Sequence, residues 1–294
     1  MNLRQLEILR AVMRCGTTVD AARELGMSQP AVSNAVKHAE SQLGFVMFDR
    51  QSNRLLPTEE AKILLAEAEP LFAVHEAVLR TARDLRSRKR GRIRIVATAE
   101  LSATLMPHVL KRFLRRDPDV DVTLDTRLLG EVVEAVELGT FDVGIAIEPY
   151  GRPDLTLTPL IKLDMMCICP PDSAVAQRAV VTPEDLAHER LIGLHTTSRL
   201  KAMIEDAFRR RGETFQPNIE VRFFNICAAL AAEGIGVAIV DSLTARSPAA
   251  VPFVVRPFEP AIQVTLSAVT AKDRPQSRLV RAFLEDLSAV LAAG

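Results

Sequence analysis

The sequence predicts an α/β protein in which a module of short helices and one long helix precede a two-lobed region of alternating strands and helices. The chain has 294 residues, 48% of them apolar, which is enough for about two domains with cores of their own. Residues 58–88 contain no glycine and a single proline, which is typical of a long helix. After Gly91, apolar segments alternate with helical segments, as in parallel α/β sheets.

The composition excludes several classes of protein. Lys plus Arg and Asp plus Glu each total 37, so the net charge is zero and a purely electrostatic nucleic-acid binder is not expected. No apolar run approaches the ~20 residues that span a bilayer, and the charged start MNLRQLEILRAVMRC does not resemble a signal peptide. We therefore expect a cytoplasmic protein without a membrane partner. The four cysteines fit neither a disulfide framework nor a zinc site, and we expect no cofactor or metal.

Two short helices, 19–25 and 28–43, are predicted to pack on each other after a first helix over 3–15. Ser28 is a good N-cap and Gly44 ends the second of the pair. One face of that helix is apolar and should bury against the first of the pair. This face is formed by Val32, Val36, Ala39 and Leu43, and its expected partners are Ala21, Ala22 and Leu25.

A different face of the helix that starts after Ser28 is polar. Gln29, Ser33 and Lys37 are spaced four apart, with Pro30 and Asn34 beside them. Two helices, a tight turn and polar side chains at the start of the second helix form a helix-turn-helix whose second helix reads the DNA major groove. The alternative is an ordinary buried helical hairpin.

Residues 45–60 have two apolar ends around a Gln-Ser-Asn turn, which predicts a β-hairpin wing. Arg50 and Arg54 would project from it toward phosphates or the minor groove, or else be solvated surface arginines. The candidate DNA contacts on the helix and the wing are Ser28, Gln29, Pro30, Ser33, Asn34, Lys37, Arg50 and Arg54.

The long helix is capped by Thr58 and carries acidic residues at its start. Apolar positions recur along it with a period of about 3.5, which predicts a coiled-coil partner helix and hence a dimer. Pro70 predicts a kink or weak point. The positions of this seam are Leu64, Ala68, Leu71, Val74 or His75, Val78 and Leu85.

These features together resemble the LysR-type transcriptional regulators. The resemblance rests on the run AAxxLxxSQPAVS over 21–33, followed by Leu43-Gly44, FxR at 48–50 and Pro57-Thr58. It implies a winged helix-turn-helix with a long linker helix, plus a two-lobed α/β effector domain resembling periplasmic binding proteins. It also implies homodimers, tetramers on promoter DNA and regulation by a small-molecule effector. Asn34 departs from the Arg common in the family, and Thr18 is expected to replace Val19 as a helix cap.

The domains expected on this basis are 1–57 for DNA binding, 58–90 for the linker and 91–294 for the effector, with lobe I at 91–161 and 268–294 and lobe II at 162–267. In open α/β sheets, ligands lie beyond the carboxyl ends of the strands. Hydroxyls there would hold a carboxylate and acids an ammonium group, so the effector could be an amino acid or an organic acid; each hydroxyl could equally be a plain N-cap. The candidate effector contacts are Thr98, Glu100, Ser102, Arg127, Glu148, His195, Thr196, Thr197, Asn225 and Asp241.

Other chemistry is weakly indicated. Cys167 and Cys169 share one face of a strand and read as buried thiols more than as a metal or redox pair, whereas Cys227 lies near a helix start that would stabilise a thiolate. No catalytic arrangement is apparent, so an enzyme is not expected. The alternative to a DNA-binding regulator is a cytoplasmic small-molecule receptor or solute-binding protein whose N-terminal segment only dimerises.

Overall fold

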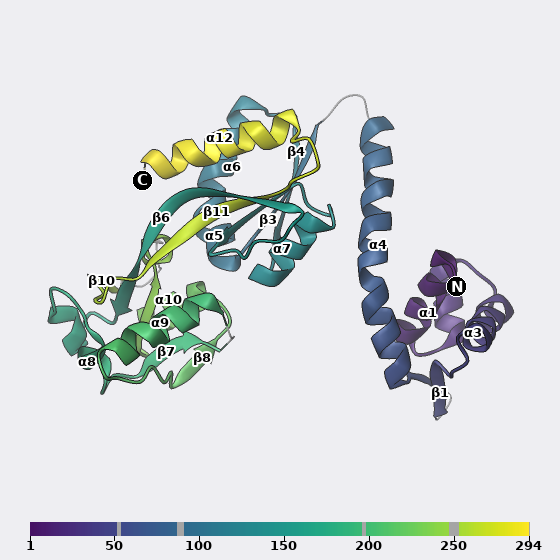
Figure 1. The fold of residues 1–294 in the computed structure, drawn as a ribbon, viewed down its shortest axis with the longest axis horizontal. Coiled ribbons are helices and arrows are strands. Elements are labelled where there is room, and N and C mark those ends of the chain that lie inside the picture. Colours follow the sequence, from purple (N-terminus) through teal and green to yellow (C-terminus); the bar gives the residue numbers. More distant parts are fainter. Residues whose placement is uncertain (52–53, 87–90, 196–197, 247–252, 294) are drawn as a thin grey trace. The chain divides into compact units, whose positions relative to one another are not determined.

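The computed structural model describes residues 1–51, 54–86, 91–195, 198–246 and 253–293 (Figure 1). The chain forms two compact units, Met1–Ala82 and Arg83–Gly294, which are described separately. No helix within the described ranges is long and apolar enough to cross a membrane.

The first unit contains helices and one small hairpin. The elements are α1 (Leu3–Cys15), α2 (Thr18–Leu25), α3 (Gln29–Leu43), the antiparallel strands β1 (Phe48–Gln51) and β2 (Arg54–Pro57), and α4 (Glu59–Arg86). Gly16, Gly26 and Gly44 end α1, α2 and α3 in the left-handed conformation that glycine adopts without strain. The predicted helices and wing are therefore present, with the long helix described as far as Arg86.

The cap of α2 differs from the prediction. The backbone N–H of Asp20 donates to Thr17 Oγ1 at 3.1 Å, so Thr17 is the N-cap and the expectation for Thr18 was wrong. The hydroxyl of Thr18 is therefore available for a contact with another helix.

The core of the first unit is built from the predicted helix faces. Val32 and Ala39 of α3 are fully buried, as are Ala21 and its neighbour Ala22 on α2. The start of α4 joins the same core, and it does so through Ala61, Leu65, Ala68 and Phe72. Ala68, predicted to face a partner helix, thus packs inside its own domain, because the first turns of α4 cover the helix-turn-helix.

The second unit has one mixed sheet with helices on its faces. Its strands are β3 (Arg92–Ala97), β4 (Asp121–Thr126), β5 (Val143–Ile147), β6 (Leu155–Cys169), β7 (Leu191–Leu194), β8 (Ile219–Val221), β9 (Val237–Asp241), β10 (Val254–Pro257) and β11 (Gln263–Ala271). Its helices are α5 (Ala99–Thr104), α6 (Met106–Arg116), α7 (Leu129–Glu137), η1 (Ala174–Gln177), α8 (Pro183–Leu186), α9 (Arg199–Arg210), α10 (Phe224–Ala232), α11 (Ser242–Ala245) and α12 (Arg278–Ala293).

Two long antiparallel strands connect the lobes (Figure 1). The strand order is β4-β3-β5-β11-β6-β9-β7-β8, with β10 pairing with β6. β4, β3 and β5 are parallel to one another in lobe I, and β8, β7 and β9 are parallel in lobe II. The register of β11 on β6 shifts between Leu266 and Ser267, opposite Ile161 and Pro159. This irregularity lies where the sequence predicts the chain to cross between lobes.

Three details of the second unit differ from the prediction. The sheet is mixed rather than parallel, because β6 and β11 run antiparallel to their neighbours. The segment between β3 and β4, where the alternating pattern predicts one helix, forms the two helices α5 and α6, since Pro107 lies in the first turn of α6, where a proline begins a helix readily. Strand β10 was not predicted.

Candidate functional site

The first candidate site is the exposed polar face of α3. Ser28 caps the helix by accepting from the N–H of Ala31 at 3.4 Å. Gln29, Asn34 and Lys37 are exposed. Among the described residues, the side chains of Asn34 and Lys37 make no hydrogen bond or ion pair. Ser33 and Pro30 complete the predicted face, the former half-buried and the latter exposed. The helix therefore presents free hydrogen-bonding groups and one free cation at its surface.

The first side chain of α3 is held from α2. Gln29 Nε2 donates to the Oγ1 of Thr18 at 3.1 Å, using the hydroxyl that the N-cap leaves available. This bond restricts the amide while its oxygen and second N–H stay unused. The sequence reasoning did not foresee it, because it assigned Thr18 to the cap.

The wing is fixed to the same helices. The N–H of Leu55 donates to the carbonyl of Gly16 at 2.8 Å, and the N–H of Met47 donates to Glu40 Oε1 of α3 at 2.8 Å. Arg54 is exposed on β2. Arg50 lies on β1, opposite Leu55, and its side chain lies outside the described set.

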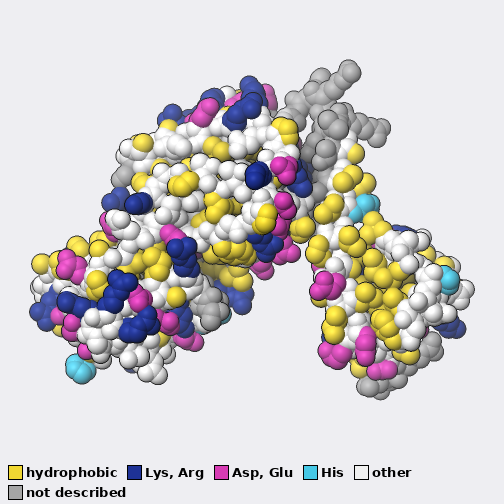
Figure 2. Space-filling model, viewed as in Figure 1, with side chains coloured by type: hydrophobic (Ala, Val, Ile, Leu, Met, Phe, Trp, Pro, Cys, Tyr) yellow, Lys and Arg dark blue, Asp and Glu magenta, His cyan; other side chains and the backbone are white. Residues whose placement is uncertain are grey.

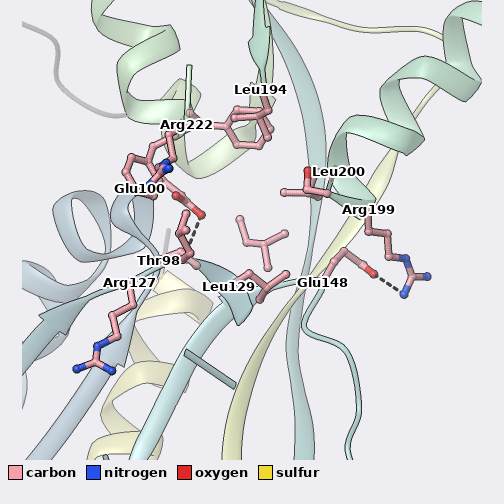
Figure 3. Close-up of a pocket in the computed structure, with 14 residues that line it drawn as sticks. Thr98, Glu100, Arg127, Leu129, Glu148, Leu194, Arg199, Leu200 and Arg222 are labelled. Carbon is pink, nitrogen blue, oxygen red and sulfur yellow. Dashed lines mark hydrogen bonds and ion pairs between the residues drawn. The ribbon is translucent and has the colours of Figure 1, made fainter. Parts of the chain in front are cut away.

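The second candidate site is a pocket of about 80 Å³ between the two lobes, beyond the carboxyl ends of β3 and β5 (Figure 3). Its wall is mostly apolar, with a few charged and hydroxyl groups, as in small-ligand sites. Given that one water needs roughly 10–15 Å³ of such space, the pocket holds about the volume of half a dozen waters. The residues that line it are Thr98, Glu100, Arg127, Leu128, Leu129, Ile147, Glu148, Leu194, Ser198, Arg199, Leu200, Arg222, Phe223 and Phe224.

Glu100 is the buried charge of this pocket. Its side chain is held by Thr98, whose Oγ1 donates to Glu100 Oε1 at 2.5 Å, and both residues are only 6% exposed. Burial raises the pKa of Glu100, the hydroxyl opposes that shift, and the nearby carboxyl of Asp241 adds to it. Burial therefore disfavours the ionised form, and a cation beside the carboxyl would stabilise that form.

Two other charged groups in the pocket are already paired. Glu148 Oε1 accepts from the N–H of Thr265 at 2.6 Å, and its Oε2 pairs with Arg199 at 3.2 Å across the lobes. Glu148 also holds a left-handed backbone, with φ of 50°. Arg127 pairs with Asp125 at 2.8 Å, and its guanidinium points away from the cavity in Figure 3.

One carboxyl group and one guanidinium remain. Among the described residues, neither Glu100 nor Arg222 has an oppositely charged partner in the pocket, and Figure 3 shows both on the same side of it. Ser198 is the N-cap of α9 and accepts from the N–H of Lys201 at 3.2 Å, so the positive end of that helix also faces the pocket.

The structure brings some of the predicted effector residues together and not others. Thr98, Glu100, Arg127 and Glu148 line the pocket, whereas Ser102, His195, Asn225 and Asp241 do not. Asp241 is fully buried and caps α11 through the N–H groups of Leu243 and Thr244, both at 3.0 Å. Burial raises the pKa of Asp241 despite these bonds.

The other predicted residues have different environments. Ser102 Oγ and Asn225 Oδ1 are buried without a hydrogen-bond partner, and His195 is exposed. Thr196 and Thr197 lie outside the described residues. Reasoning from strand ends missed Arg199 and Arg222, although each lies within a few residues of the end of a strand.

The cysteines show no reactive character. Cys167, Cys169 and Cys227 are buried free thiols. Burial raises the pKa of Cys227 to about 12, so the expectation of a stabilised thiolate there was wrong, because desolvation outweighs the helix start. Within the described ranges, no group of three or more His, Cys, Asp or Glu could hold a metal ion.

Comparisons with known proteins agree with this architecture. Residues 3–62 match the family model "Bacterial regulatory helix-turn-helix protein, lysR family", and residues 86–292 match "LysR substrate binding domain". The chain is 34% identical over 291 residues to the Regulatory protein NocR of Agrobacterium fabrum, covering 99% of this chain and 97% of that protein. It is 30% identical to the Transcriptional activator protein LysR of Escherichia coli, covering 99% and 94%.

A solved structure shows the same fold. Full-length CbnR complexed with its target DNA superposes with a TM-score of 0.75 at 20% identity, covering 99% of this chain and 100% of that chain. A winged helix-turn-helix joined to a two-lobed ligand-binding domain defines a ligand-responsive DNA-binding regulator. This chain belongs to the LysR family of transcriptional regulators, and the predicted fold class and family are confirmed.

Proposed function

We propose that this regulator reads promoter DNA with the exposed face of α3 and responds to a small zwitterion, such as an amino acid, bound between its lobes. The DNA proposal is carried by the free side chains of α3: Gln and Asn pair bidentately with adenine, and Lys reaches guanine or phosphate. Glu40 of α3 holds the wing through the N–H of Met47. With α3 in the major groove, Arg54 on the wing would therefore lie beside the phosphate backbone of the DNA. The protein would act in the cytoplasm, where the chromosome is.

The effector proposal rests on the two unpaired charges of the interlobe pocket. A buried carboxyl without a partner favours a ligand cation, and Arg222 with the start of α9 favours a ligand carboxylate. The other charged side chains of the lining are already paired: Arg127 with Asp125, and Glu148 with Arg199. A ligand with one group of each sign satisfies what the pocket leaves unsatisfied, whereas a neutral sugar does not.

Isothermal titration of the full-length chain with amino acids, their decarboxylated amines and their deaminated acids tests this class of ligand. Arg222→Gln should weaken amino-acid binding about tenfold or more, since a hydrogen bond to a charged group contributes ~1.5–3 kcal/mol. Arg127→Gln is the matched control, because that guanidinium faces away and is already paired. Equal losses in the two variants, or binding of sugars alone, would contradict the proposal.

Footprinting on the DNA upstream of its own gene tests the DNA proposal independently. We expect protection over two or more helical turns, lost in Gln29→Ala and altered by the bound ligand. The control is Gln42→Ala, on the same helix but outside the polar face. Protection that survives in Gln29→Ala would remove α3 from the interface without affecting the effector proposal.

We further propose that α4 pairs with α4 of a second copy, giving a dimer that can assemble into tetramers. Beyond the part that packs on its own domain, α4 exposes an apolar stripe (Figure 2). Leu71, Val74 and Val78 are 55%, 42% and 61% exposed and are spaced three and four apart, as in a coiled-coil seam. Val78→Asp should shift sedimentation toward a monomer, and Lys62→Glu, outside the stripe, should not. The side chain of Leu85, also predicted on this seam, is not described.

A further inference from the structure

A second hollow, which the proposed effector site does not use, lies elsewhere in the two-lobed unit. It has a volume of about 710 Å³, within the range of about 300–1,000 Å³ typical of ligand pockets. It is lined by α6 and α12 of lobe I, by the connecting strand β6 and by α11 of lobe II. Figure 1 shows the C-terminal end of α12 over β6 at this place. No lining residue is shared with the interlobe pocket.

The floor of this groove is apolar. Leu105 and Leu163 are 4% exposed, and Ile161, Leu243 and Leu291 are partly buried beside them. Apolar side chains from separate elements thus form one concave surface, which gains free energy when an apolar body displaces water from it, at about 25 cal/mol per Å².

The charged lining of the groove is mainly basic. Of the described residues that line it, Arg112, Lys162 and Arg246 are basic and Asp164 is acidic, and Arg246 already interacts within the protein. The carboxylate is held by Gln263, whose Nε2 donates to Asp164 Oδ1 at 3.0 Å, and Arg112 is partly balanced by Asp286 at 2.8 Å. Lys162 is exposed and has no ion pair among the described residues. An uncompensated cation over an apolar floor favours an anion that carries an apolar body.

We propose that this groove is a second ligand site, which takes a small amphiphilic organic anion such as a carboxylate on an alkyl or aromatic body. The anionic group lies at Lys162 and the apolar body on the leucine floor. Because the lining comes from both lobes and from the strand between them, the ligand contacts all three at once. None of its lining residues lines the interlobe pocket that is proposed for the zwitterion.

Titration of the full-length chain with anilinonaphthalene sulfonate, a fluorescent amphiphilic anion, tests this site. Lys162→Glu should weaken dye binding at least fivefold, whereas Lys111→Glu, at another exposed lysine, on α6 and outside the groove, should change it less than twofold. Ala289→Trp, which fills the groove, should abolish most of the fluorescence gain. Decanoate should displace the dye, and decanol at the same concentration should not.

Three results would overturn the proposal. Dye binding that weakens equally in the two lysine variants would place the dye elsewhere, for example on the apolar stripe of α4. Unchanged binding in Ala289→Trp would show that the groove is not occupied. A change of molecular mass in that variant, measured by light scattering, would assign the groove to contacts between copies of the chain. Arg222→Gln should leave dye binding unchanged, which separates this test from that of the interlobe site.

Discussion

The recognition face of α3 and the interlobe pocket hold their charges in opposite ways. On α3, Asn34 and Lys37 are exposed and unpaired, so water solvates them until a partner arrives. In the pocket, Glu148 and Arg127 are paired within the protein, and burial raises the pKa of Glu100. The face of α3 can therefore pair with any group of opposite charge, whereas most charges of the pocket already have partners within the protein.

This difference indicates which variable controls each site. Exposed cations bind DNA by releasing counterions from phosphates, so the affinity of α3 should depend on salt. A buried carboxyl changes its charge with pH, so ligand affinity in the pocket should depend on protons.

Salt titration of DNA binding should separate the two kinds of contact on α3. Gln29→Ala should lower the affinity for the protected promoter sequence about ten- to a hundredfold, since a bidentate base contact contributes ~1–3 kcal/mol, and should leave the salt slope unchanged. Lys37→Ala, if it contacts phosphate, should weaken all sequences alike and reduce the slope by about one. Fluorescence anisotropy at several salt concentrations measures both. A fall in the slope with Gln29→Ala would contradict the division of roles.

The stability of the protein should depend on pH through Glu100. Because its pKa is raised in the folded chain, the native state binds more protons than the unfolded state above the ordinary value of 4.5. The free energy of unfolding should therefore fall as pH rises from that value through the folded pKa. Glu100→Gln removes this contribution, so the variant should gain stability relative to the parent as pH rises. Asp241, whose pKa is also raised, keeps its share of the slope in both proteins.

Urea unfolding between pH 4 and pH 8 measures this difference, with Glu134→Gln on the exposed face of α7 as the control. The same carboxyl should make ligand binding depend on pH. A cationic group beside Glu100 stabilises the charged form, so amino-acid affinity should rise with pH in the parent and lose that dependence in Glu100→Gln. A parallel pH profile in the variant would show that the carboxyl does not meet the ligand.

The two sites also differ in how far they were predictable from the sequence. The face of α3 follows from a helical period and a cap, both local, so the buried set of Val32, Val36 and Ala39 was predicted correctly. The pocket depends on which strand ends the sheet brings together, and only the rule for strand ends was available. That rule correctly placed Glu100 and Glu148 at the pocket. It also placed Asp241 there, whereas the carboxyl of Asp241 caps α11 and does not line the pocket.

The remaining errors concern the direction of strands, the point where a strand ends and contacts between distant parts of the chain. An apolar strand pattern does not reveal whether a strand runs parallel or antiparallel to its neighbours, so the mixed sheet was not foreseen. Arg222 was missed because residues 219–224 read as one strand, whereas β8 ends at Val221 and Arg222 follows it directly. Pairings such as Arg199 with Glu148 join residues far apart in the chain, and no local pattern encodes them.

The smallest expected effect concerns that interlobe ion pair. Arg199 is 68% exposed, so solvent screens the attraction, and exposed pairs contribute about 0.2–1 kcal/mol. Arg199→Gln should therefore change the stability of the unliganded chain by no more than this, measured by urea unfolding. Glu148→Ala should cost more, because it removes both the ion pair and the acceptor for the N–H of Thr265 on β11. If instead Arg199→Gln costs as much as Glu148→Ala, the ion pair rather than the bond to β11 sets the position of Glu148, and the charges of the pocket depend on contacts between the lobes more than the contrast with α3 requires.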